Sequence, residues 1–236
     1  MKITEVIKKI IKAFIPYGII WAYNKYKAYK YKDKTTKEIF TEIKKKNYWG
    51  STESVSGSGS VLKQTQSLIT ELPKILKEKC IKTFLDIPCG DFNWMKELDL
   101  SSIHYIGADI VDEIINENKK KYETNNIKFV VMDIIKDTLP MSDIIFVRDC
   151  FVHLSFENIL KAIENIKKSG SKYLLTTTFT DRIKNIDIVT GDWRPINLEI
   201  MPFLFPKPEK IIIENCTEGD GEYKDKSMGL WNIKKL

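Results

Sequence analysis

The sequence predicts an α/β protein with a mostly parallel sheet and helices on both faces of that sheet. Short apolar runs alternate with longer amphipathic stretches between residues 82 and 178, and this alternation is typical of a parallel sheet with covered faces. Acidic residues stand at or just past several of the apolar runs. Because an open α/β sheet binds its ligands beyond the carboxyl ends of its strands, these acids also indicate where a site would lie.

The order of elements can be read along the chain. A charged helix is expected at 34–46, and the Gly and Ser residues of 47–60 indicate a loop. Ser60 is a candidate cap for a helix that begins at Val61, and Pro73 is expected to bend or break that helix. The remaining patterns predict strands at 82–87, 104–109, 127–132, 143–148 and 172–178, with helices at 93–97, 111–123 and 156–168.

The alternation stops after Thr178. Residues 179–208 are rich in Pro, Asn and aromatic residues, and a long segment of this kind in a compact domain is usually a lid or a binding loop. Two last strands are expected at 210–216 and 227–234, paired antiparallel at the edge of the sheet.

Composition excludes several classes of protein. With 236 residues, of which 43% are apolar, the chain can bury the core of one α/β domain with an N-terminal extension. Its four cysteines form no CxxC pair and its two histidines have no Cys or His cluster around them, so no metal site is expected. Free thiols suit a reducing cytoplasm, where we expect the protein.

Charge is unevenly distributed. Residues 1–46 carry thirteen lysines against four acids, a balance of +9, whereas the remainder of the chain has a balance of −3. Nucleic acid is therefore not an expected partner, although the net charge is +6. Residues 1–31 read as a basic amphipathic segment, and the uncharged run within it, 13–23, is too short to span a bilayer. Two interpretations remain open: contact with the inner face of an anionic membrane, or packing on the body or on a second subunit in a homodimer.

Four acids stand in register at the ends of the predicted strands: Asp86, Asp109, Asp133 and Asp149. A carboxylate at the end of a second strand is suited to two ribose hydroxyls. The loop after the first strand has no G-x-G-x-x-G, so a pyrophosphate cradle for a dinucleotide is not indicated. A cationic ligand without phosphate fits the acids better, and S-adenosylmethionine has those properties.

The stretches LDIPCGDFNWM, YIGADI, VVMDI and DIIFVRDCFVHLS resemble, in order and spacing, the cofactor motifs of class I S-adenosylmethionine-dependent methyltransferases. With YWGSTESVSGSGS and TGDWRPINL, the set is similar to bacterial methyltransferases encoded with capsule and surface-polysaccharide genes. The resemblance implies a Rossmann-like fold for 47–236, with seven strands in the order 3-2-1-4-5-7-6 and residues 1–46 as a basic helical extension.

The resemblance also implies a cofactor, S-adenosylmethionine, with S-adenosylhomocysteine as product, and a set of residues that bind it. Asp86 would orient the loop and the methionine amino group, and Asp109 would hold the ribose. The family usually has two or three glycines in this loop, whereas this chain keeps only Gly90. The implied cofactor residues are Asp86, Cys89, Gly90, Asp109, Ile110, Asp133, Ile134 and Arg148.

His153 is the candidate general base, because an alcohol is a poor nucleophile until its proton is removed and imidazole has a suitable pKa. The alternative is a histidine at a helix start that only bonds to the backbone. Asp149 is a second candidate, either as a base or as the acid that orients His153. Arg148 could bind phosphate, lock the cofactor loop through Asp149, or form a structural ion pair.

The acceptor is expected to be a sugar, either free as a nucleotide-sugar or held in a glycan. Sugar hydroxyls are read by mixed polar and aromatic side chains, and an arginine can grip a diphosphate. Packing that closes the domain would explain the same residues. The candidates for substrate binding are Tyr48, Trp49, Asp192, Trp193, Arg194 and Asn197.

The leading hypothesis is therefore a sugar O-methyltransferase, with a nucleotide-linked heptose as one candidate acceptor. A nucleic-acid or other small-molecule methyltransferase is an alternative, although the fourth motif, RDCF, lacks the Pro-Pro-aromatic pattern of base N-methylases. A non-catalytic scaffold that binds S-adenosylmethionine is the third.

Overall fold

The computed structural model describes residue 26 and residues 29–236. The chain forms two compact units, Met1–Thr35 and Thr36–Leu236. Most of the amphipathic segment predicted for 1–31 lies outside the described residues. Helix α3 (Thr36–Lys45) confirms the charged helix expected at 34–46, and this helix belongs to the second unit. Among the residues that are described, no helix is long and apolar enough to cross a membrane.

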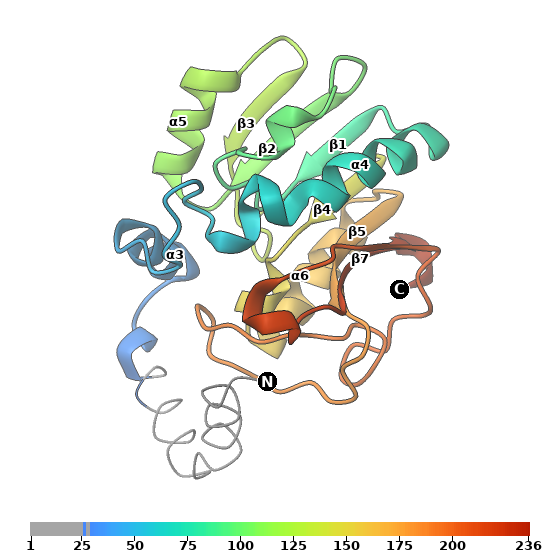
Figure 1. The fold of residues 1–236 in the computed structure, drawn as a ribbon. Helices are drawn as coiled ribbons and strands as arrows, with labels where there is room; N and C mark the ends of the chain where they lie inside the picture. The colour runs from blue at the N-terminus through green and yellow to red at the C-terminus, as the bar shows by residue number, and fades with distance from the viewer. Residues whose placement is uncertain (1–25, 27–28) are drawn as a thin grey trace. The chain divides into compact units, whose positions relative to one another are not determined.

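The second unit is built on one seven-stranded sheet with the predicted order, β3-β2-β1-β4-β5-β7-β6 (Figure 1). The five strands from β3 to β5 are parallel, and β7 pairs antiparallel with both β5 and β6. The mostly parallel sheet and its antiparallel edge are therefore confirmed. The strands are β1 (Thr83–Asp86), β2 (His104–Asp109), β3 (Ile127–Val131), β4 (Ile144–Val147), β5 (Tyr173–Phe179), β6 (Lys210–Ile213) and β7 (Lys226–Asn232).

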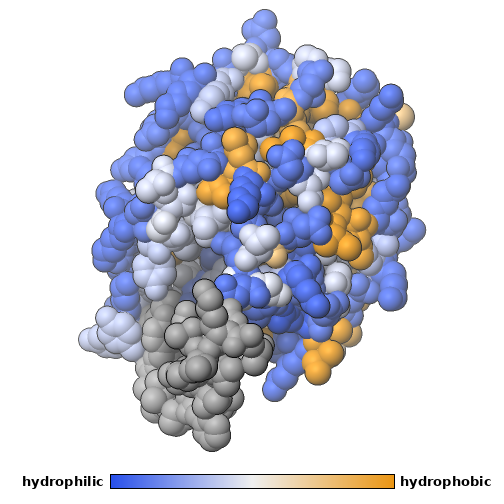
Figure 2. Space-filling view, viewed as in Figure 1, coloured by the Kyte–Doolittle hydropathy of each residue, from blue (hydrophilic) through white to orange (hydrophobic). Residues whose placement is uncertain are grey.

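Helices cover both faces of the sheet. Alternate side chains of β1 point to opposite faces, so Phe84 lies in a core with buried residues of α4 (Leu62–Glu78) and α5 (Asp112–Tyr122). Leu85 lies in the other core with α6 (Phe156–Lys168). Most of the surface seen in Figure 2 is hydrophilic, with scattered hydrophobic side chains.

Three details differ from the expectations. Pro73 does not break α4, whose buried Leu72 and Leu76 pack into the core on either side of it. Ser60 does not cap that helix, because the carboxylate of Glu53 accepts the Leu62 N–H at 2.7 Å instead. The helix expected at 93–97 is a single 3-10 turn. The 3-10 turns are η1 (Ser58–Ser60), η2 (Met95–Glu97), η3 (Phe151–His153), η4 (Glu218–Gly221) and η5 (Ile233–Lys235).

The long segment 180–209 contains no helix or strand, yet side-chain hydrogen bonds fix its path. The buried Asn185 amide donates to the carbonyls of Asn197 and Met201 at 2.8 and 2.9 Å. Asn197 in turn donates to Arg182 O at 2.9 Å. Buried backbone N–H and C=O groups need side-chain partners of this kind where no helix or strand provides hydrogen bonds.

Candidate active site

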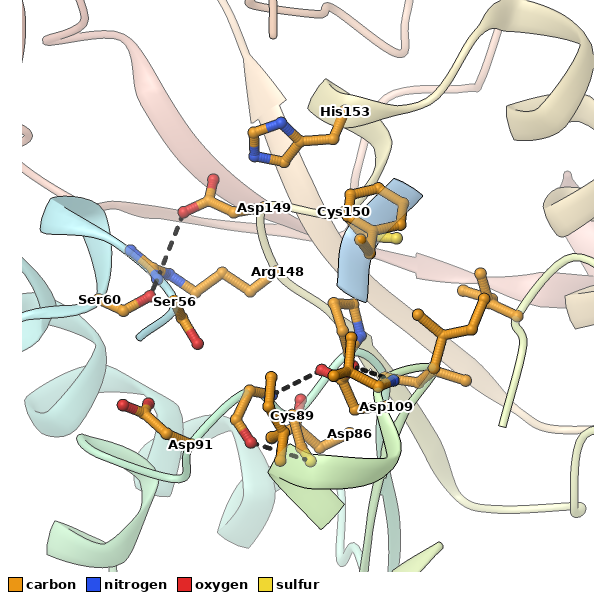
Figure 3. Close-up of a pocket in the computed structure, with 18 of the residues that line it drawn as sticks. Ser56, Ser60, Asp86, Cys89, Asp91, Asp109, Arg148, Asp149, Cys150 and His153 are labelled. Carbon is orange, nitrogen blue, oxygen red and sulfur yellow. Dashed lines mark hydrogen bonds and ion pairs between the residues drawn. The ribbon is translucent and has the colours of Figure 1, made fainter. Parts of the chain in front are cut away.

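A first cavity opens beyond the carboxyl ends of β1, β2 and β4 and encloses about 1100 Å³, its mouth included. In Figure 3, Asp86, Cys89 and Asp109 lie at one end of it, and Asp149 and His153 lie at the other. All eight residues predicted to bind the cofactor line this cavity. The shared edge of parallel strands thus brings together acids that are far apart in the sequence.

The loop after β1 needs its single glycine for two reasons. Gly90 has a φ of 53°, in the left-handed region that L side chains rarely adopt. A Cβ on Gly90 would also clash with the side chain of Ser56, which covers the loop and would have to shift. Asp91, which the sequence analysis missed, holds that segment by accepting hydrogen bonds from Ser54 Oγ and Val55 N, both at 2.9 Å.

Asp86 and Asp109 are buried acids with uncharged donors. Tyr105 donates its hydroxyl to Asp86 Oδ2 at 2.6 Å, and burial raises the pKa of Asp86 to about 8. The two oxygens of Asp109 each accept one backbone N–H, from Gly90 at 3.2 Å and from Val111 at 2.9 Å. Burial raises the pKa of Asp109 to about 6. Both carboxylates keep lone pairs for a ligand, because each oxygen can accept more than one hydrogen bond.

Cys89 is a structural residue of the loop after β1 and not a nucleophile. Burial raises the pKa of its thiol well above the ordinary value, which disfavours the reactive thiolate. Asn118, a residue of α5 that sequence reasoning missed, donates to Gly90 O at 2.7 Å and lies 3.8 Å from Cys89 Sγ. The loop is therefore held from the helix beside it.

The segment after β3 supplies a mostly apolar wall. Asp133 Oδ1 accepts the Ile135 N–H at 2.8 Å, and burial raises the pKa of Asp133. Its neighbour Ile134 is buried and faces the same cavity as Ile110. A flat apolar ring would be covered by such residues, with a carboxylate at its edge.

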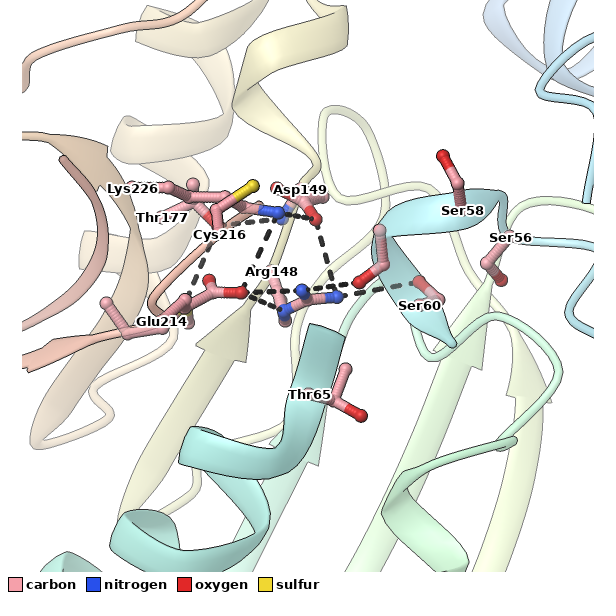
Figure 4. Close-up of polar contacts among 12 residues, drawn as sticks. Ser56, Ser58, Ser60, Thr65, Arg148, Asp149, Thr177, Glu214, Cys216 and Lys226 are labelled. Carbon is pink, nitrogen blue, oxygen red and sulfur yellow. Dashed lines mark hydrogen bonds and ion pairs between the residues drawn. The ribbon is translucent and has the colours of Figure 1, made fainter. Parts of the chain in front are cut away.

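Arg148 is a buried structural cation, although it also lines the first cavity. Its Nη2 donates to Glu214 Oε2, a contact that Figure 4 draws, at 2.6 Å. The same Nη2 donates to Gly59 O at 2.8 Å. Its Nη1 lies 3.3 Å from Asp149 Oδ2. Through these contacts the guanidinium joins the residue after β4 to the η1 turn and to the residue after β6. Three roles were considered for Arg148: phosphate binding, locking of the cofactor loop and a structural ion pair. These contacts fit the structural ion pair.

Asp149 is an ionised carboxylate and a weak base. Lys226 Nζ lies 2.6 Å from its Oδ2, and the two cations Lys226 and Arg148 outweigh burial and lower the pKa of Asp149 to about 2. No hydrogen bond joins Asp149 to the His153 ring among the described residues, which is the contact an orienting acid would make. Lys226 was not found from the sequence, because it comes from the start of β7, seventy-seven residues away.

His153 lies on η3 with a defined ring orientation. Its Nδ1 is 2.8 Å from the carbonyl oxygen of Asp192. A carbonyl can only accept, so Nδ1 carries a proton and Nε2 of the neutral ring is left as an acceptor. Burial lowers the pKa of His153, which keeps the ring neutral. Trp49 packs against it with ring centroids 5.0 Å apart.

A second cavity adjoins the first and shares Trp49, Ser56, Asp149 and His153 with it. Most of its other walls come from loops and turns that are distant in sequence. Trp193 and Tyr223 form an aromatic panel, with ring centroids 4.8 Å apart. The polar and remaining aromatic lining includes Ser58, Phe179, Cys216, Glu218 and Lys226.

Only some of the predicted acceptor residues reach the second cavity. Trp49 and Trp193 line it, and Asp192 contributes its carbonyl to His153. The side chain of Tyr48 is 59% exposed and lines neither cavity. Asn197 is buried in the loop described above, where its amide bonds to backbone carbonyls.

Arg194 also lies away from both cavities, and its donors hold the turn that carries His153. Its Nη1 donates to Phe151 O at 2.6 Å and its Nη2 to Leu154 O at 2.8 Å, on either side of His153. Burial lowers its pKa to about 10, so it stays charged at neutral pH. A diphosphate has no access to these donors.

Comparison with known proteins agrees with this architecture. Residues 85–175 match the family model described as a methyltransferase domain, and a search of the curated proteins found no match. The PH0226 protein from Pyrococcus horikoshii OT3 is 16% identical, with a TM-score of 0.54 over 80% of this chain and 98% of that one.

Two further solved structures have similar values. N-methyltransferase NodS from Bradyrhizobium japonicum WM9 is 14% identical, with a TM-score of 0.52 over 72% of this chain and 96% of that one. Human N-acetylserotonin methyltransferase in complex with SAM is 16% identical, with a TM-score of 0.53 over 83% of this chain and 59% of that one. At these identities the likeness concerns the fold, which is the Rossmann-like fold of class I methyltransferases.

The domain match and the fold together support a methyltransferase whose cofactor is S-adenosylmethionine. The first cavity fits that cofactor on observations of its own. Gly90 leaves the loop backbone bare where a Cβ would not fit, and Asp86 and Asp109 present carboxylates with uncharged partners. A cationic amino group and ribose hydroxyls are suitable ligands for these acids.

Proposed function

We propose that this chain transfers a methyl group from S-adenosylmethionine to a hydroxyl of a sugar in the synthesis of a bacterial capsule or surface polysaccharide. The sugar would be nucleotide-activated, with a heptose as one candidate, or part of a glycan. The observation that carries this proposal is the place of His153, which lines both cavities with an accepting Nε2.

If the methyl group is transferred to a hydroxyl, a base is needed where the two cavities meet, because the hydroxyl must lose its proton. When bound, S-adenosylmethionine supplies a methyl group on a sulfonium, whose carbon–sulfur bond breaks with its electron pair left on sulfur as the acceptor oxygen bonds the carbon. His153 Nε2 would take the hydroxyl proton, a contribution of about 10²–10⁴-fold in rate. The Asp192 carbonyl would stabilise the imidazolium by accepting a hydrogen bond from Nδ1–H throughout.

The walls of the second cavity support a sugar as the acceptor. Trp193 and Tyr223 offer flat apolar faces, while Glu218 and Lys226 offer an acceptor and a donor of hydrogen bonds. The predicted arginine grip on a diphosphate is not part of this proposal, because Arg194 is engaged with the η3 turn. Any diphosphate would therefore lie outside the cavity, with the sugar ring inside.

We further propose that the enzyme works in the cytoplasm and that its basic extension, residues 1–31, rests on the inner face of the membrane. The excess of lysine over acid in the N-terminal segment supports attraction to anionic lipid. The extension could instead serve a homodimer, and sedimentation with and without anionic vesicles separates these two outcomes.

The test is transfer of labelled methyl from S-adenosylmethionine to a panel of methyl glycosides, nucleoside-diphosphate sugars and, as amine controls, aminosugars. We expect a base-stable methyl ether on a sugar hydroxyl. His153→Gln should lower kcat by about 10²–10⁴-fold, while His104→Gln, which changes the exposed histidine of β2, should retain full activity.

The pH dependence of the same reaction provides a second readout. Because burial lowers the pKa of His153, the rate should fall only as the pH drops below the ordinary range of histidine. Methylation of amines alone, or full activity of His153→Gln, would contradict the proposed function.

A further inference from the structure

The second cavity contains an anchoring pair, Asp149 and Lys226, that the transfer step itself does not use. Every polar contact of the Asp149 carboxylate with the described residues is made through Oδ2, to Lys226 Nζ at 2.6 Å and Arg148 Nη1 at 3.3 Å. Its Oδ1 accepts no hydrogen bond from the described part of the chain. Asp149 lines both cavities, so this second oxygen has a cavity to face.

Lys226 completes the pair with spare donors. With the residues that the structure describes, its Nζ makes one hydrogen bond, to Asp149. It stands 3.7 Å from Glu214 Oε2, which is an ion-pair distance and too long for a hydrogen bond. An ammonium has three N–H donors. The side chain is 7% exposed and lines the second cavity. A substrate hydroxyl in that cavity could therefore replace water as the partner of the remaining N–H donors.

We infer that the acceptor presents two neighbouring hydroxyls, one to His153 Nε2 and the other to the pair formed by Asp149 Oδ1 and Lys226 Nζ. A hydroxyl both donates and accepts, so it can donate to the carboxylate and accept from the ammonium at once. This inference rests on the proposed function and narrows its substrate to a vicinal diol. It also gives Asp149 a binding role in place of the role of a base.

The environment of Asp149 favours an anchor over a base. Arg148 and Lys226 keep its pKa at about 2, so the carboxylate is a permanent acceptor but takes protons poorly near neutral pH. Figure 3 draws its carboxylate on the side of the cavity where His153 lies, and the two groups interact electrostatically. The neighbouring hydroxyl would therefore fix which oxygen of the sugar meets the base.

The experiment uses the full chain and the best acceptor of the glycoside panel, with its methylated carbon located by NMR. Analogues that lack the hydroxyl on either neighbouring carbon are compared with it. For the wild type, loss of one of these hydroxyls should lower kcat/KM by about 10- to 100-fold, as expected for a hydrogen bond to a charged group.

Two variants connect that loss to the pair. Asp149→Asn suits the φ of 51° at this position, because Asn tolerates the left-handed region. Lys226→Met keeps the stem and removes the donors. Each should lose activity on the diol but hardly any on the deoxy analogue, so that the two changes are not additive. Lys210→Met, at an exposed ion pair on β6, is the matched control.

Binding of S-adenosylhomocysteine and thermal unfolding show whether each variant is folded. If Lys226→Met does not fold, Asp149→Asn and the wild-type comparison carry the test. Equal kcat/KM for the diol and both deoxy analogues would overturn this inference and leave the proposed function standing. Methylation of no sugar hydroxyl, with the cofactor still bound, would overturn both.

Discussion

The two cavities use the same kind of side chain, a carboxylate at or just past the end of a strand, in opposite electrostatic settings. In the first cavity, the donors that the described residues offer to Asp86 and Asp109 are uncharged. Burial raises the pKa values of these two acids to about 8 and about 6. At the boundary with the second, Asp149 lies against two cations, and its pKa falls to about 2. The position of an acid in the topology thus predicts where it lies but not its charge.

This difference suits the two ligands. A buried acid that has no cationic hydrogen-bond partner ionises with difficulty until a cation binds next to it. The first cavity is therefore suited to an ammonium group. An acid already neutralised by Lys226 and Arg148 has no need of a cation, and its free oxygen can serve a neutral hydroxyl. The contrast can be tested residue by residue.

The largest effect is expected on stability. Arg148→Met leaves Glu214, which is buried, without its main partner, and breaking a buried pair in this way costs about 3–5 kcal/mol. Asp86→Asn should change the free energy of unfolding by less than about 1 kcal/mol, because Tyr105 can still donate to the amide oxygen. Urea unfolding measures both. A larger loss for Asp86→Asn would reverse the proposed contrast.

The next effect is a pH dependence of cofactor binding. In the free protein Asp86 holds a proton up to about pH 8, and an ammonium group favours its ionised form. Affinity for S-adenosylhomocysteine should therefore rise with pH below 8, by up to about tenfold per pH unit, with release of a proton. Calorimetry at pH 7 in phosphate and in Tris detects that proton as a difference in heat. Asp86→Asn should abolish the difference, and equal heats for the wild type would refute the assignment.

The smallest effects separate two adjacent aromatic residues. Trp49→Ala removes a ring that packs against His153 and lines both cavities, and should lower kcat/KM by about 3- to 10-fold. Tyr48→Ala changes an exposed side chain outside both cavities, so we expect a change of less than about twofold. Steady-state kinetics on one acceptor compares the two variants. A larger loss for Tyr48→Ala would mean that the acceptor binds elsewhere.

Sequence reasoning located the first cavity because its parts are local. Asp86, Asp109 and Asp133 each follow an apolar run, and a parallel sheet must bring such ends to one edge. The sheet order came from the resemblance and is confirmed. The covering segment held by Asp91 could not be anticipated, since its contacts cross more than thirty residues.

The second cavity was predicted less well because its residues meet only through long-range packing. Lys226, Glu218 and Tyr223 carry no local signal that would link them to His153. Arg194 and Asn197 have the right chemistry for a sugar, yet backbone carbonyls occupy their donors. Those of Arg194 bond to Phe151 O and Leu154 O at the η3 turn, and that of Asn197 bonds to Arg182 O within the irregular segment 180–209. For a polar residue in a buried loop, hydrogen bonds to the backbone of the protein have to be considered before a role in ligand binding.

The most direct test of the account is calorimetric titration of the full chain with S-adenosylhomocysteine, with NAD as control ligand, in wild type and Asp109→Ala. Asp112→Ala, at an exposed acid three residues away, serves as the matched variant. We expect micromolar binding of S-adenosylhomocysteine alone, retained by Asp112→Ala and lost in Asp109→Ala. Binding of NAD, or no binding of S-adenosylhomocysteine by the folded wild type, would contradict the assignment of the first cavity.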